Sequence, residues 1–323
     1  FIIDDEAVVE QPVINEEAGT IVFAVNEEVE SLKFTPIIEI SEGATITPAS
    51  GVAQDFSNNK KVTYTVTAED GTVKVYTAFV EGTRKVLKYS FEDWKEGTKN
   101  DELLPKDLWA GSAAGAGILG GTLLRKETRE DGTYAAKLIT FEYPNEPNSL
   151  VPKITAGSIF IGKFDMMPAL QGDRLSCTKF GLDAETVSLG GKPLRFKGVY
   201  KYESGSNYLD ASNYEDVKPV DIKDKGQIQA VLYKVQTGED GKEIVLTGHD
   251  VNTSELRVAV ANIIVEDIKE YTPFNIEFEY LQEYDRTAKY KFAIICSSSK
   301  DGDLFKGAGG STLIVDEFEV ICE

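Results

Sequence analysis

Short runs in which apolar and polar residues alternate cover most of this chain. In residues 62–68, apolar side chains alternate with threonines, and the Asp-Gly turn at 70–71 leads into a second run of the same kind. A period of two is that of a β-strand whose faces meet different surroundings, and an Asp-Gly pair between two such runs signals a hairpin. Runs at 274–280 and 290–296, and a turn at Gly241, continue the pattern. The sequence therefore predicts an all-β protein of antiparallel strands.

Long amphipathic helical patterns do not occur. Residues 253–268 could form one helix or a pair of strands, and their β-branched side chains favour strands. The composition changes near residues 81–83, where we place a boundary between a small acidic domain, 1–83, and a larger domain, 84–323. Residues 97–122 are rich in glycine but lack the Lys-Ser/Thr pair of a phosphate loop, so we expect a loop or closely packed strands there.

The charge of the chain narrows its possible partners. Its 323 residues carry a net charge of −20, and residues 1–83 alone contain 15 acidic and 4 basic side chains. Such a surface repels nucleic acid and anionic lipid, so we expect neither as a partner. No apolar run approaches the roughly 18 residues that a transmembrane segment needs.

The C-terminal end, residues 295–321, places a carboxylate where an apolar side chain is expected. A polar, glycine-rich loop separates two strands, and counting by two puts Asp316 on the same face as Ile314 and Phe318. A bare charge on a buried face costs several kcal/mol or more. Asp316 must therefore be neutralised, hydrogen-bonded or bound to a metal.

Three cysteines, Cys177, Cys296 and Cys322, cannot all pair within one chain. If the last two strands form an antiparallel hairpin, Cys296 lies far from Cys322, which argues against a bridge between them. We expect buried, inert thiols.

Three segments together resemble a known family. They are LKYSFEDW at 87–94, PLRFKGVYKY at 193–202 and SSSKDGDLFKGAGGSTLIVDEFEV at 297–320. As a set they resemble the putative carbohydrate metabolism domain of surface lipoproteins from gut Gram-negative bacteria, over about residues 86–323. Residues 1–83 are similar to the small immunoglobulin-like domain that often precedes this domain, chiefly in ISEGATITPASGVAQDF and AEDGTVKVYTAFV.

The resemblance implies a fold, a location and a class of partner. It implies an immunoglobulin-like spacer over 1–83, followed over 84–323 by a two-sheet jelly roll similar to carbohydrate-binding modules. It also implies export and anchoring at the cell surface as an outer-membrane lipoprotein. The implied partners are a polysaccharide or oligosaccharide and other surface proteins of glycan utilisation.

Sugar-binding modules stack sugar rings on exposed aromatic side chains and hold hydroxyls with charged or amide groups. The candidates for this role are Trp109, Trp94, Tyr143, Arg195 and Tyr202, together with Tyr200. Trp109, in the glycine-rich segment, is the leading candidate for an exposed platform. Tyr200 and Tyr202 share a strand face with Phe196, and they are structural if that face belongs to the core.

Related jelly rolls often hold a structural calcium ion with a Glu near the first strand and an Asp in the last strand. Glu92 and Asp316 match those positions, and Asp301 and Asp303 could add ligands or could simply shape their turn. Calcium needs six to eight oxygens, so two acids would need carbonyls and waters as well.

Support for catalysis is thin. His249 is the single histidine, in a polar turn, which excludes a multi-histidine metal site. Glycosidases need two carboxylates about 5–10 Å apart, and no spacing in the sequence singles out a pair. The leading hypothesis is a non-catalytic, exported glycan-binding protein. The alternatives are an adhesion or structural surface protein that binds another protein or a pilus component, and a weak glycoside hydrolase.

Overall fold

The computed structural model describes residues 1–148 and 151–323, with 48% of the chain in strands and 5% in helices. The prediction of an all-β protein is confirmed. The chain divides into two compact units, one of residues 1–86 with the last three residues, the other of residues 87–320. The boundary predicted at 81–83 lies inside one long strand, β7 (Val73–Tyr89), because Gly82 continues the strand pairing opposite Ala24.

The first unit is a small β-structure around an aromatic core. Its strands are β1 (Val8–Asn15), β2 (Thr20–Asn26), β3 (Lys33–Phe34), β4 (Thr45–Thr47), β5 (Gln54–Asp55), β6 (Val62–Thr67) and β7, with a 3-10 turn at Ser57–Asn59. β2 pairs with β7 in parallel, and β6 pairs with β7 as the predicted Asp-Gly hairpin. The rings of Phe34 and Phe56 pack edge-on against Phe23. The immunoglobulin-like assignment of this unit stays a prediction.

The second unit is a jelly-roll sandwich of two sheets. In one sheet β27 pairs with β12 and β18. This sheet, called sheet A here, contains β11 (Leu124–Thr128), β12 (Tyr134–Ile139), β18 (Pro193–Glu203), β23 (Ile268–Glu277) and β27 (Thr312–Cys322). The last two long strands do not form the predicted hairpin, since β25 belongs to the opposite sheet.

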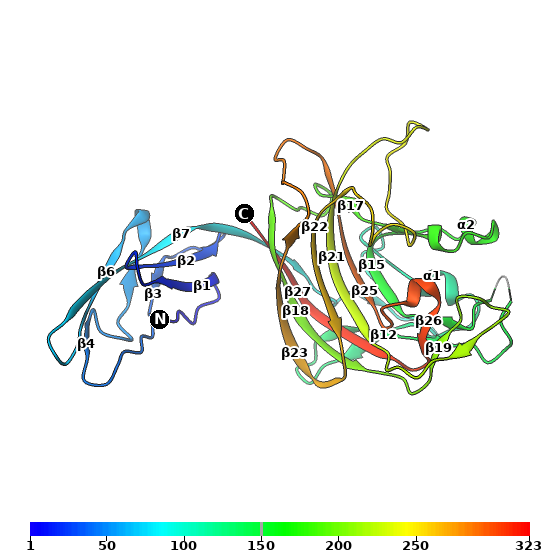
Figure 1. The fold of residues 1–323 in the computed structure, drawn as a ribbon, viewed down its shortest axis with the longest axis horizontal. Helices are drawn as coiled ribbons and strands as arrows, with labels where there is room; N and C mark the ends of the chain where they lie inside the picture. Colours follow the sequence, from blue (N-terminus) through cyan, green and yellow to red (C-terminus); the bar gives the residue numbers. More distant parts are fainter. Residues whose placement is uncertain (149–150) are drawn as a thin grey trace. The chain divides into compact units, whose positions relative to one another are not determined.

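The opposite sheet, called sheet B here, has the order β10-β15-β25-β21-β22-β24. Its strands are β10 (Trp109–Gly111), β15 (Ser158–Phe164), β21 (Gly226–Lys234), β22 (Arg257–Val265), β24 (Glu279–Tyr280) and β25 (Tyr290–Ser297), with β16 (Thr178–Phe180) and β17 (Leu182–Asp183) at its margin. β22 confirms the preference for a strand within residues 253–268. Figure 1 shows β22, β21, β25 and β15 side by side.

Successive side chains along each strand of sheet B point alternately to its two faces. Ile159, Ile228 and Ile294 are fully buried and belong to the side chains that face the interior of the sandwich. From sheet A, Phe318 packs edge-on against Phe196 with ring centroids 5.0 Å apart. The residues between these positions point to the other face of sheet B, which is covered along part of its length and lines a cavity at one end.

Short elements complete the unit. They are β8 (Trp94–Lys95), β9 (Glu102–Leu103), β13 (Phe141–Glu142), β14 (Ile154–Thr155), β19 (Tyr208–Asp210), β20 (Lys218–Pro219), β26 (Lys306–Ala308), the one-turn helices α1 (Ala113–Ala116) and α2 (Met167–Leu170), and the 3-10 turns η2 (Leu175–Cys177) and η3 (Gly302–Leu304). In the glycine-rich segment, a Cβ at Gly111 would lie 2.3 Å from the carbonyl oxygen of Ser158, so close strand packing requires glycine there. No helix in the described part of the chain has the length and apolar character to cross a membrane. All three cysteines are buried free thiols.

Candidate functional site

A row of polar side chains crosses three neighbouring strands of sheet B on its outer face. In the strand register, Ser158 of β15 and Gln227 of β21 both lie opposite Ser297 of β25. The next row contains Gln229, opposite Ile295 and Asn262. This end of the sheet therefore presents hydroxyl and amide groups, the donors and acceptors that bind sugar hydroxyls.

The same face is apolar and fully covered further along the strands. Val231, Tyr233 and Ala293 are fully buried there, beneath a cluster that includes Phe180 and Val251. The exposed polar row begins where this covering ends. The change from apolar to polar positions along single strands thus produces a recess rather than a flat surface.

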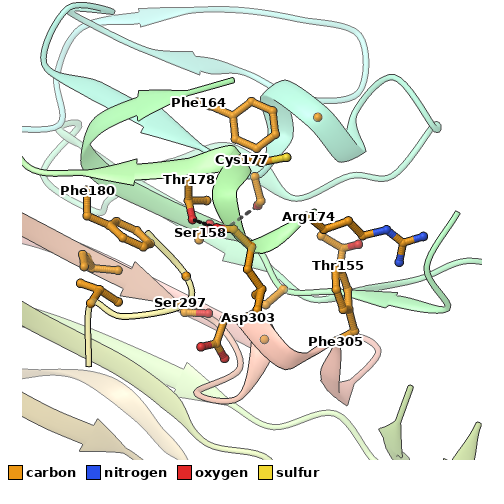
Figure 2. Close-up of a pocket in the computed structure, with 18 of the residues that line it drawn as sticks. Thr155, Ser158, Phe164, Arg174, Cys177, Thr178, Phe180, Ser297, Asp303 and Phe305 are labelled. Carbon is orange, nitrogen blue, oxygen red and sulfur yellow. Dashed lines mark hydrogen bonds between the residues drawn. The ribbon is translucent and has the colours of Figure 1, made fainter. Parts of the chain in front are cut away.

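A cavity of 210 Å³ lies over the polar row. Ser158, Ser297, Gln227 and Gln229 line one part of it. An apolar wall lines another part and consists of Leu119, Phe164, Met166, Ala169, Leu175 and Phe180. Figure 2 shows Phe164 and Phe180 apart from Asp303, with Ser297 beside that carboxylate.

Asp303 places a negative charge at this cavity. Its Oδ1 atom accepts a hydrogen bond from the backbone N–H of Leu304 at 3.0 Å. The residue reaches solvent, yet neighbouring protein atoms displace much of the water around its carboxylate, and this desolvation raises its pKa. Among the described residues that line the cavity, Asp303 is the one carboxylate. It is therefore a strong acceptor available to hydroxyl donors.

A cation stacked on an aromatic ring forms another side of the cavity. The guanidinium carbon of Arg174 lies 5.1 Å from the ring centroid of Phe305, and its Nη2 atom donates to the carbonyl of Asn148 at 3.2 Å. Phe305 follows η3 with a φ of 57°, and this left-handed turn directs the chain into β26. The second cation at the cavity, Lys300, is paired with Asp301 at 2.6 Å.

A buried hydrogen-bond network lies behind the polar row. The carboxylate of Asp224, only 2% exposed, accepts bonds from the hydroxyls of Ser299 and Ser311 at 2.6 and 2.7 Å and from the backbone N–H groups of Lys225 and Ala308 at 2.8 Å. No charged side chain donates to it among the described residues. Burial therefore raises the pKa of Asp224 more than these four bonds lower it.

Hydroxyl groups extend this network to the strand ends. Thr140 Oγ1 lies 2.6 Å from Ser299 Oγ and 2.7 Å from Ser298 Oγ, and the backbone N–H of Gly157 donates to Ser298 Oγ at 3.0 Å. Ser298 and Gly157 immediately adjoin Ser297 and Ser158 of the polar row. The network thus fixes the strand ends that carry the proposed binding groups.

The comparisons with known proteins assign the chain to a family. Residues 60–321 match the family model described as "Putative carbohydrate metabolism domain". The chain belongs to this family. Residues 1–80 match a second model, described as "SGBP, N-terminal". The first match gives the protein a carbohydrate-related role, whereas the second is confined to the first unit.

Two solved structures are similar to this member of the putative carbohydrate metabolism domain family. A putative glycoside hydrolase from Bacteroides thetaiotaomicron is 30% identical, with 99% of this chain and 95% of that chain covered and a TM-score of 0.63. A putative glycoside hydrolase from Bacteroides vulgatus is 28% identical, with 73% of this chain and 98% of that chain covered and a TM-score of 0.60. The search of curated proteins gives no match.

Three of the aromatic residues predicted to bind sugar in this family member are buried. Trp109 is 5% exposed because it lies in β10 rather than in a loop, where it packs against Tyr89 and Phe91. Tyr143 is 3% exposed and packs edge-on against Phe141, and Tyr202 is 2% exposed and donates to the carbonyl of Ser298 at 3.1 Å. The expectation that Trp109 forms an exposed platform is wrong, and for Tyr202 the structural alternative holds, because this part of the aromatic face of β18 belongs to the core.

The other predicted sugar-binding residues are partly exposed but lie outside the cavity. The indole N–H of Trp94 donates to the carbonyl of Phe91 at 2.5 Å, and Arg195 pairs with Glu277 at 2.7 Å. Tyr200 is half-buried near Phe274. Within the described residues, none of these side chains lines the cavity over sheet B. Their roles in glycan binding stay predictions.

Asp316 is buried, as predicted, and Arg129 neutralises it. The predicted continuous face of Ile314, Asp316 and Phe318 is wrong, because the strand alternation is interrupted after Asp316. The Nη1 atom of Arg129 lies 2.5 Å from Asp316 Oδ2 and also contacts Glu317. Glu317 has a φ of 55°, which interrupts the alternation of β27, so that Leu313 and Val315 are buried before it and Phe318 after it. Burial raises the pKa of Asp316 more than the bonds from Arg129 lower it.

The structure brings Glu92 and Asp316 to one cavity, and the calcium site between them stays a prediction. The carboxylate of Glu92 faces the backbone N–H of Tyr134, at 3.2 Å, and Asp316 already has a cationic partner. Within the described residues, no group of three or more acidic, histidine or cysteine side chains is arranged to hold a metal. Asp301 accepts bonds from Tyr208 and Lys300, which leaves it engaged elsewhere.

We therefore expect calcium not to change the stability of the protein. A cation that binds only the folded state raises the melting temperature through mass action. Melting curves with EDTA and with added calcium, at matched ionic strength, should coincide. A higher melting temperature in calcium would support the calcium prediction and would require the Arg129–Asp316 pair to rearrange.

The residues of the polar row were not among the predicted site residues, although the sequence contains a signal for them. In GQIQAVLYK, residues 226–234, two glutamines alternate with apolar residues and then give way to valine and tyrosine on the same face. That change marks where a covered face becomes exposed. The register that aligns Gln227 with Ser297 and Ser158 depends on strands far apart in the chain.

Proposed function

We propose that this protein is a non-catalytic glycan-binding protein whose site is the cavity over sheet B. The observation that supports this most directly is the row formed by Ser158, Ser297 and Gln227, with Asp303 beside it. Amide, hydroxyl and carboxylate groups in one recess match the alternating donors and acceptors of a sugar. The ligand is a polysaccharide or oligosaccharide.

The cavity favours binding over hydrolysis. Glycosidases place two carboxylates on either side of the scissile bond. Asp303 is the one carboxylate among the described lining residues, and the neighbouring Asp301 is held by Lys300 and Tyr208. The site can hold a sugar through Asp303, but among the lining residues that the structure describes there is no second acid to complete a hydrolytic pair.

The N-terminal match supports a proposal about location. We propose that the protein is exported and anchored at the cell surface as a lipoprotein, where it captures glycan for other surface proteins of glycan utilisation. The surface glycan-binding family matched by residues 1–80 supports this location. The first unit then acts as a spacer that carries the binding unit.

We expect Asp303→Asn to weaken glycan binding by about 10- to 100-fold, because hydrogen bonds to a charged group contribute roughly 1.5–3 kcal/mol. The wild-type chain is first tested on a panel of soluble polysaccharides and oligosaccharides, and the affinity for the best ligand is measured by titration calorimetry. Asp240→Asn is the matched control, since Asp240 also accepts a backbone N–H in an exposed turn but lies outside the cavity.

Further results distinguish glycan binding at this cavity from a different binding site, from hydrolysis and from adhesion. If Trp94→Ala or Arg195→Ala abolishes binding while Asp303→Asn does not, the cavity is not the site. Release of sugar from the bound glycan by the wild-type protein, but not by Asp303→Asn, would contradict the non-catalytic assignment. Failure to bind any glycan, together with a stable complex with a surface protein, would favour the adhesion alternative.

A further inference from the structure

The apolar wall of the cavity continues outward onto exposed side chains. Met167 and Leu170 of α2 are 58% and 63% exposed, and Ile118 and Leu119, which follow α1, are 74% and 38% exposed. The two helices are neighbours, because a Cβ at Gly115 in α1 would lie 2.5 Å from the ring of Phe164 and 3.4 Å from the sulfur of Met166. Flexible aliphatic and thioether groups thus border one side of the opening, and clustered exposed apolar side chains mark ligand sites.

A ligand that consists of unsubstituted sugar does not match both sides of this cavity. Its hydroxyls can pair with Ser297, Gln227 and Asp303, but hydroxyls facing Leu119 and Met166 would lose water without gaining a partner. Unpaired polar groups are costly to bury. Of the two rings in this wall, Phe180 is 7% exposed and Phe164 is partly buried, so neither offers a fully exposed face on which a sugar ring could stack. The ligand should therefore be polar on one side and apolar on the other.

We propose that this site recognises a glycan that carries a short acyl ester, with its sugar hydroxyls on the polar row and its acyl group against Leu119, Phe164 and Met166. This inference rests on the proposed function and adds the class of glycan. A short substituent fits better than a long lipid chain because sugar and substituent share a cavity of 210 Å³. No bond is broken, and the ester remains intact in the complex.

The test compares one glycan with and without its esters. Mild alkali removes acyl esters from an acylated polysaccharide and leaves its glycosidic bonds intact. Titration of the full chain with both forms should show at least about five-fold tighter binding of the acylated form, the gain expected from burying one or two carbon groups. Equal affinity for the two forms overturns this inference and leaves the proposed function standing. If the protein binds neither form and no other glycan, the proposed function itself is overturned.

A matched pair of variants tests whether the apolar wall causes the preference for the acylated glycan. Leu119→Ser changes a residue that lines the cavity, and Leu281→Ser changes the same residue type at a similarly exposed position outside the cavity and its apolar border. We expect Leu119→Ser to remove most of the preference for the acylated form, and Leu281→Ser to leave both that preference and the affinity for the deacylated form as in the wild type. If Leu119→Ser instead converts a dimer into a monomer by light scattering, the wall binds a second copy of the chain and the inference is wrong.

Discussion

Asp224→Ala should lower the free energy of unfolding of the second unit by about 3–5 kcal/mol. The substitution leaves four buried donors without their acceptor: the hydroxyls of Ser299 and Ser311 and the backbone N–H groups of Lys225 and Ala308. Each unsatisfied buried group costs roughly 1–3 kcal/mol, and rotation of the hydroxyls recovers part of that cost. Urea unfolding followed by tryptophan fluorescence measures the effect, since Trp94 and Trp109 both belong to the second unit.

The control for this substitution is Asp221→Ala, an exposed aspartate three residues earlier. It should change the free energy of unfolding by less than about 0.5 kcal/mol. A similar small change for Asp224→Ala would mean that the buried network does not stabilise the strand ends. In that case the positions of Ser297 and Ser158 would have to be held by the sheet alone.

The difference in stability between the wild type and Asp224→Asn should depend on pH, and the direction of that dependence can be predicted. Because the pKa of Asp224 is raised in the folded state, the folded protein retains this proton at higher pH than the unfolded chain does. The stability of the wild type relative to Asp224→Asn should therefore be greatest below the ordinary pKa of 3.8 and should decrease as the pH rises through the folded-state value. An increase over that range would contradict the burial of an uncompensated carboxylate.

Arg129→Met should also destabilise the second unit by about 3–5 kcal/mol, because it leaves the carboxylate of Asp316 buried without a cation. Asp316 has only 4% of its side chain exposed, and Arg129 is itself packed over the ring of Tyr271 at 4.7 Å. The cost should fall when Asp316→Asn is added, since a neutral amide is cheaper to bury than a charge. Urea unfolding of the two single variants and the double variant measures this coupling.

Lys126→Met is the control for the loss of a cation. Lys126 pairs at 2.9 Å with Glu96, whose side chain is 77% exposed. Exposed pairs contribute about 0–1 kcal/mol, so this change should be small. If Arg129→Met were equally mild, Asp316 would have another compensating partner, and the case for a bound cation at Glu92 and Asp316 would become stronger.

Local patterns in the sequence were sufficient to predict the class of fold and several of its strands and turns. The alternation at 62–68 and the Asp-Gly turn predicted the β6–β7 hairpin, because neighbours in sequence determine both the strand period and the turn. The same reasoning identified Asp316 as a buried charge in need of a partner. Three segments carried the family resemblance that the matched model confirms over residues 60–321.

The exposure of individual side chains and the location of the cavity required the folded chain. Trp109 follows a glycine-rich pattern typical of loops, yet its pairing with β15 buries it, and a left-handed residue at Glu317 shifts the buried face of β27. Ser158, Gln227 and Ser297 form one row only because β15, β21 and β25 pair in a particular register. Contacts between strands so far apart in the chain depend on the packing of whole sheets, and no local period or propensity encodes them.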